Sequence, residues 1–208
     1  MKLSYRQLEA ILAAYLNVHP DKVGTFRSRL KQLQRLEFPP GVNIGRGVRM
    51  TYSAEHLLQL AVAFEVIGAG LAAKSATELV SGHWKAFQMA FARAHYRLAY
   101  GSDAETYVCV AGRGPVEPER QISEPVTVHD LTSLTEQVLC FPRSDAPARA
   151  GMILIRADYL LDRLHRLVRD VGQVVNARWS PEYALWKAER DKNQPLWDYS
   201  DGGSPVPF

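Results

Sequence analysis

A series of basic side chains in the first quarter of the chain has a spacing suited to neutralising a polyanion. Arg27, Lys31 and Arg35 follow one another at i, i+4 and i+8, and Arg29 adds a further cation. In a helix these cations would run beside an apolar face made of Phe26, Leu30 and Leu33. Such a helix can pack on its own domain and still offer cations to phosphates and base edges in a nucleic-acid groove. An ordinary amphipathic surface helix with solvated charges would show the same pattern.

A second basic feature follows in residues 38–52, which are rich in glycine and proline and punctuated by valine, isoleucine and tyrosine. This composition predicts a short hairpin. Arg46 stands between Gly45 and Gly47, which permit a tight tip, and Arg49 lies three residues further on. An exposed hairpin that carries arginines is suited to contact phosphates or a minor groove as a wing. The alternative is a solvated turn.

The charge of the 208-residue chain is unevenly divided. The formal net charge is only +3, but residues 1–52 contain nine lysines and arginines against three acids, which leaves a charge of −3 for the remainder. This division concentrates a positive field on the N-terminal segment, as expected of a surface that binds phosphates. Arg6 belongs to the same segment and is a further candidate contact.

Catalytic residues are not suggested by any comparable pattern. His95, His129 and His165 can be imagined in a pair with Cys109 or Cys140, but nothing in the sequence brings them together and no nucleophile-elbow motif surrounds either cysteine. The two cysteines are far apart and do not form a metal-binding or redox motif, and no dinucleotide fingerprint is found. We therefore expect no enzyme, no cofactor and no metal site.

The elements that must position the basic residues can be predicted from periodicity. Apolar residues at helical spacing predict helices over 4–16 (capped by Ser4), 20–36, 54–69, 73–81, 84–100 and 131–139, and a last one that begins near Asp158. Short apolar runs predict strands over 106–111, 126–128 and 152–155. The composition, with 47% apolar and 23% charged residues, is typical of a globular chain.

These elements predict a mainly helical α+β protein. We divide it into an N-terminal winged helix-turn-helix over 1–82, a small α/β domain over 83–179 and a partly extended tail over 180–208. The last helix shows a coiled-coil-like seam made of Leu160, Leu164, Leu167, Val171 and Val174. This seam can pack on the chain's own sheet or on a second copy. We expect a homodimer formed through the C-terminal domain.

The order of a helix, a turn, a basic helix, an arginine-bearing hairpin and two further helices resembles the DNA-binding domain of the MerR family of regulators. Thr25-Phe26-Arg27 is similar to the Thr-Leu-Arg segment of that family's recognition helix. Gly47-Val48-Arg49-Met50-Thr51-Tyr52 is similar to its wing motif Gly-Tyr-Arg-x-Tyr, with Val48 in the aromatic place and one extra residue before Tyr52. Gly70, Ala76 and Leu79 are similar to the pattern that closes the domain.

The resemblance covers about residues 3–80 and implies that Thr25, Arg27, Arg29 and Lys31 face the major groove or its flanking phosphates. It also implies that Arg46, Arg49 and Tyr52 contact the DNA backbone from the wing. Ser28-Arg29 departs from the family's Tyr-Tyr, and residues 84–100 lead into strands instead of the family's long dimerisation helix. The metal-sensing cysteines of some members are missing.

The function expected from these observations is a sequence-specific transcription regulator that binds double-stranded DNA. The alternative is an architectural or phage-type factor, of the excisionase or packaging kind, that uses the same fold without sensing an effector. No apolar run is long enough for a membrane span and no signal peptide begins the chain. We therefore expect a cytoplasmic, nucleoid-associated protein that has no membrane partner.

Overall fold

The computed structural model describes residues 2–42, 50–101, 105–111, 125–139 and 152–171. Within these ranges the protein is a mainly helical α+β fold with two small antiparallel sheets. The predicted wing tip with Arg46 and Arg49, the second cysteine Cys140 and the predicted tail over 180–208 lie outside the described residues. None of the described helices is both long enough and apolar enough to cross a membrane.

Helices α1 and α2, with a 3-10 turn between them, form the N-terminal end of the fold. Helix α1 (Tyr5–Tyr15) begins at Ser4, whose hydroxyl accepts from the Gln7 backbone N–H at 3.3 Å while the Gln7 side chain accepts from the Ser4 N–H at 2.9 Å. This reciprocal capping satisfies two backbone donors that the helix leaves without a partner. The helix predicted over 20–36 is divided into a 3-10 turn, η1 (Pro20–Lys22), and helix α2 (Val23–Arg35).

Helix α3 (Ala54–Gly68) lies at the centre of this end of the molecule and is buried on nearly every side. It is followed by α4 (Ala73–Gly82). Strands β1 (Leu3–Ser4) and β2 (Thr51–Tyr52) pair antiparallel just before α1 and α3, with Leu3 opposite Tyr52. This two-residue ladder ties the beginning of the chain to the residues that follow the segment 43–49.

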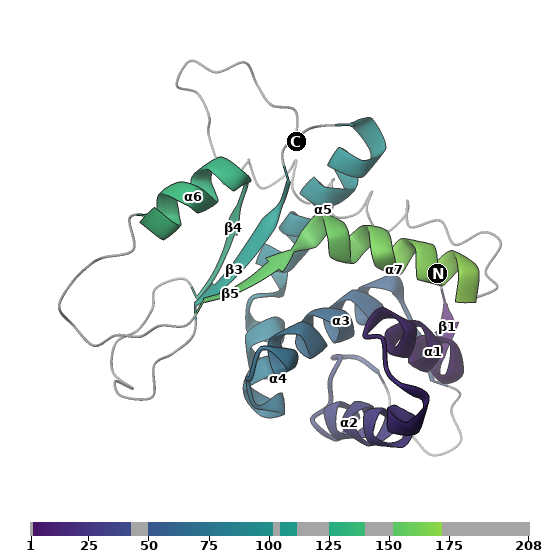
Figure 1. Cartoon of the computed structure of the whole chain (residues 1–208). Coiled ribbons are helices and arrows are strands. Elements are labelled where there is room, and N and C mark those ends of the chain that lie inside the picture. Colours follow the sequence, from purple (N-terminus) through teal and green to yellow (C-terminus); the bar gives the residue numbers. More distant parts are fainter. Residues whose placement is uncertain (1, 43–49, 102–104, 112–124, 140–151, 172–208) are drawn as a thin grey trace.

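The second sheet is built from the strands predicted in the C-terminal half. Strands β3 (Tyr107–Ala111), β4 (Val126–His129) and β5 (Met152–Arg156) lie in the order β4-β3-β5, and both pairings are antiparallel. The expected α/β arrangement, which implies parallel strands, is therefore wrong for this half. Helices α5 (Trp84–Tyr100) and α7 (Ala157–Val171) pack against the sheet, and α6 (Leu131–Leu139) contacts β4 (Figure 1).

The hydrophobic core is continuous across the boundary predicted at residues 81–83. Only His83 separates α4 from α5, and the buried cluster extends from Leu3 to Val168. Helix α7 packs against both α1 and α5, so it joins the two halves. Leu160 and Leu164 of the predicted seam are 1% and 0% exposed within this one chain. The described part of the seam is thus an intrachain contact, and its assignment to a dimer interface is not supported.

A buried carboxylate fixes the junction of β5 and α7. Asp158 is 3% exposed and accepts from Arg97 Nη1 at 2.7 Å, from Arg156 Nε at 3.1 Å and from the Thr106 backbone N–H at 3.3 Å. These bonds connect the start of α7 with α5 and with the residue before β3. Because a buried charge is stable only when it is paired and hydrogen-bonded, the cluster holds these elements in one arrangement.

Candidate nucleic-acid interface

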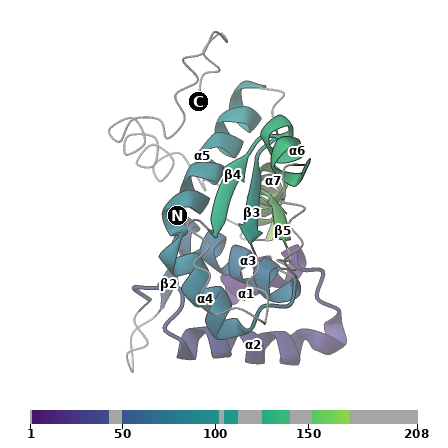
Figure 2. The same cartoon turned by 90° about the vertical axis from the view of Figure 1, so that its left-hand side faces the viewer.

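Helix α2 is attached to the rest of the protein along one narrow apolar seam. Phe26, Leu30 and Leu33 are 5%, 0% and 1% exposed, and the Phe26 ring lies 5.4 Å from the ring of Phe64 on α3. The seam has the i, i+4, i+7 spacing of a single helix face. In both views α2 lies at the edge of the molecule, on the side away from the three-stranded sheet (Figures 1 and 2).

The outward side of α2 is basic and contains small residues. At about 100° per residue, Gly24, Ser28 and Arg35 lie opposite the seam, and Lys31 lies between them and Arg27. A Cβ added at Gly24 would have no neighbour within 4 Å, so the surface in front of the first turn is open. The thirteen residues of α2 contain four cations and no acid. This face combines positive charge with room for the close approach of a ligand.

The cations of α2 differ in how far they are already neutralised. Arg27 Nε donates to Glu9 Oε1 of α1 at 2.6 Å, with side-chain exposures of 56% for Arg27 and 13% for Glu9. Arg29, Lys31 and Arg35 are exposed and have no acidic partner among the described residues. Arg29 stands about 200° around the helix from Arg27, so it lies on the opposite flank and not in the same stripe. The basic surface is therefore broader than the predicted stripe.

The structure separates the predicted contact residues into three groups. Thr25, Arg27, Arg29, Lys31 and Arg35 all lie on α2 with exposed side chains, and Arg6 is exposed on α1. Arg46 and Arg49 lie outside the described residues. The third group is Tyr52 alone, whose predicted position on the wing surface is wrong because its side chain is only 1% exposed.

Tyr52 is an anchor of strand β2 and does not form part of the exposed surface. Its hydroxyl accepts from Gln34 Nε2 at 2.7 Å, and its ring meets the His56 ring edge-on at 6.2 Å. Burial raises the pKa of this phenol, which stays neutral at physiological pH. The residue thus anchors β2 to the C-terminal half of α2, directly after the segment 43–49. An alternation of apolar and polar residues along β2 would have indicated that Tyr52 is buried. A strand of two residues is too short to show such an alternation.

Sequence reasoning missed two features of this surface. The ion pair between Arg27 and Glu9 joins residues 18 positions apart, and no sequence signal announces it. The small residues Gly24 and Ser28 are one helical turn apart on the outward face, and a helical projection of residues 23–35 would have identified them.

Cys109 and the histidines His95, His129 and His165, which the sequence offers for a cysteine–histidine pair, lie within the described residues. Cys109 is buried in β3, and burial raises the pKa of its thiol to about 11. The reactive thiolate is therefore disfavoured at neutral pH. His129 bonds to Thr127 Oγ1 of the same strand, β4, at 2.9 Å. Among the described residues, no group of three or more histidine, cysteine or acidic side chains is placed to hold a metal ion.

The surface of α2 is thus the strongest concentration of unpaired charge found on a single described element. A scan against protein-family models and a search of curated proteins found no match to this chain.

Proposed function

We propose that this protein is a sequence-specific transcription regulator that binds double-stranded DNA through α2. The observation that carries the proposal is the exposure of α2, which has four cations, no acids and small outward residues on a helix held by a single apolar seam. A helix with its side chains is about 10–12 Å across, which matches the roughly 12 Å width of the major groove of B-DNA.

The side chains of α2 divide naturally between two kinds of contact. Thr25, Ser28 and Gln32 are exposed polar groups suited to base edges and sugar-phosphate oxygens. Lys31, Arg35 and the flanking Arg29 would contact phosphates, because long cationic side chains at the margins of a groove reach the backbone on either side. Arg6 would add a phosphate contact from α1.

The finer architecture that we propose is a MerR-like winged helix-turn-helix. Support comes from the order of α1, the turn with η1, and α2, and from the β1–β2 ladder at the base of the predicted hairpin. Arg46 and Arg49 would reach the DNA backbone from that hairpin. The protein would act without enzymatic activity or a cofactor, and as a homodimer if its operator is a pseudo-palindrome.

The proposal is tested by selecting bound sequences from a random duplex pool with the full chain, then measuring affinity for the selected duplex. Lys31→Ala and Arg35→Ala should reduce retention and affinity while leaving the circular dichroism spectrum unchanged. Arg166→Ala is the control, because it removes an exposed cation from a different helix, α7. Equal losses in all three variants would refute α2 as the DNA-binding element.

The same selection separates a regulator from an architectural factor. A regulator should enrich one discrete motif, whereas an architectural factor should enrich flexible or weakly specified sites and bend them. Analytical ultracentrifugation of the complex then gives the number of chains per duplex. A protein that enriches no sequence and shows no salt-dependent affinity for duplex DNA would contradict both forms of the proposal.

A further inference from the structure

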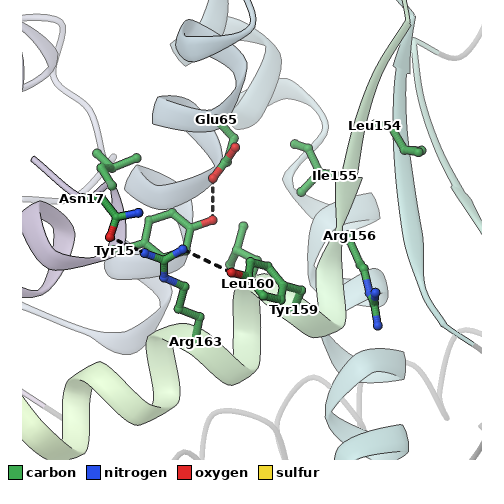
Figure 3. A pocket seen from close by; sticks show the side chains of 10 residues that line it. Tyr15, Asn17, Glu65, Leu154, Ile155, Arg156, Tyr159, Leu160 and Arg163 are labelled. Atoms are coloured by element: carbon green, nitrogen blue, oxygen red, sulfur yellow. Dashed lines mark hydrogen bonds between the residues drawn. The ribbon is translucent and has the colours of Figure 1, made fainter.

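A cleft lies where the N-terminal helices meet the C-terminal sheet. The end of α1, one residue of α3, the end of β5 and the first turns of α7 enclose a space of about 290 Å³ (Figure 3). This volume is at the lower end of the range for pockets that bind small molecules. No residue of α2 lines the cleft, and neither the sequence pattern nor the proposed DNA-binding function assigns a role to it.

The cationic wall of the cleft is formed by Arg163 of α7. Its Nη2 donates to Asn17 Oδ1 at 2.8 Å and to the Ala14 carbonyl at 3.4 Å, and its Nη1 donates to the Tyr159 hydroxyl at 3.2 Å. The guanidinium carbon lies 5.4 Å from the centre of the Tyr15 ring. All of these partners are neutral. Of its five N–H groups, three make these bonds, so two have no acceptor among the described residues.

The other charged groups of the cleft are already engaged. The Tyr15 hydroxyl donates to Glu65 Oε1 at 2.5 Å, and burial together with this bond raises the pKa of the phenol so that it remains a neutral donor. Arg156 is paired with Asp158 and Glu105. Arg163 is thus the one lining cation without a carboxylate partner in the described part of the chain.

Apolar side chains complete the lining beside this cation. Ile155 and Leu160 contribute aliphatic surface, whereas the Leu154 side chain lies on the opposite face of β5 from Ile155 and is 46% exposed (Figure 3). A guanidinium N–H that has no acceptor can donate to a carboxylate, and such charge-assisted bonds are strongest where water is partly excluded. We propose that this cleft binds a small molecule that has an apolar body and one carboxylate, with Arg163 as its anion anchor.

The test uses two carboxylates, benzoate and hexanoate, with benzamide, hexanamide and benzamidine as neutral and cationic analogues. Binding to the full chain is measured by ligand-observed NMR and isothermal titration calorimetry, without DNA. At least one carboxylate should bind about tenfold or more tightly than its amide, because a hydrogen bond to a charged group accounts for that ratio. Benzamidine should bind more weakly than benzoate.

Arg163→Gln should abolish the preference for the carboxylate over the amide, whereas Arg166→Gln, one turn further on α7, should retain it. Because Arg163 also holds Asn17, a second variant keeps the positive charge at this position: Arg163→Lys should retain part of the preference for the carboxylate that Arg163→Gln loses. The proposal is overturned if neither carboxylate binds saturably up to about 10 mM, if the amides bind equally well, or if Arg163→Gln leaves the preference unchanged. Lys31→Ala should not affect this binding, so failure here is distinct from failure of the DNA-binding proposal.

Discussion

The ion pair between Glu9 and Arg27 leads to a prediction that distinguishes this surface from a generic basic patch. Glu9 Oε1 accepts from Arg27 Nε at 2.6 Å. The carboxylate therefore partly neutralises one of the four cations of α2. Replacing Glu9 with glutamine keeps an oxygen that can accept this hydrogen bond but removes the negative charge. If α2 binds duplex DNA, Glu9→Gln should therefore increase the affinity, although most substitutions at a binding surface reduce it.

The magnitude follows from counterion release. Each phosphate contact contributes about −0.9 to the slope of log affinity against log salt concentration. If Arg27 gains one full contact, the slope becomes steeper by about 0.9, and the affinity of the variant falls about 3.5-fold further than that of the unmodified protein between about 50 and 200 mM salt. Lys31, which has no acidic partner, should give the opposite result: Lys31→Gln makes the slope shallower by about the same amount. Loss of this partly exposed ion pair, whose hydrogen bond the glutamine oxygen can keep, should lower the free energy of unfolding by only about 1 kcal/mol.

Fluorescence anisotropy with a labelled random-sequence duplex measures these slopes without knowledge of the operator. Asp162→Asn is the matched control, since it makes the same change in net charge and releases Arg166 on α7. The reasoning is refuted if Glu9→Gln leaves the slope unchanged, or if Asp162→Asn steepens it equally. The second result would mean that only the total charge of the protein matters.

Three further predictions concern stability and reactivity. Asp158→Ala should lower the free energy of unfolding by about 3 kcal/mol in urea titrations, because the half-buried Arg97 guanidinium would lose its ion pair with this buried carboxylate; a loss below about 1 kcal/mol would contradict this. Burial lowers the pKa of His56 below its ordinary 6.5, so the unfolded chain binds this proton first and stability decreases as pH falls below 6.5. His56→Gln, which retains a capping side chain, should flatten that pH dependence in urea titrations at pH 7 and 5, and an unchanged slope would refute it. In a Cys140→Ser background, Cys109 should react with a thiol reagent at pH 8 at least about tenfold faster in urea than in the folded protein, and equal rates would show an accessible thiol.

Much of the secondary structure was predictable because each helix carries its own local signals. Ser4 makes the predicted cap of α1, and Ser53 caps α3 in the same way. The division of residues 20–36 into η1 and α2 was not predictable, because Pro20 is compatible with the first turn of either kind of helix. The antiparallel pairing of β3 with β5 was also beyond sequence reasoning, since a buried apolar run does not indicate its partner or direction.

The amino-acid sequence alone determined that α2 is amphipathic, that its cations outnumber its acids, and that no local catalytic or metal-binding motif accompanies it. These properties depend on residue type and spacing, which helical geometry converts into faces. Tertiary structure decided which of those groups are available. It buried Tyr52, paired Arg27 with Glu9 and brought Arg163 against Tyr15. Such contacts join residues that are distant along the chain, and only the packing of complete helices brings them within hydrogen-bonding or ring-contact distance.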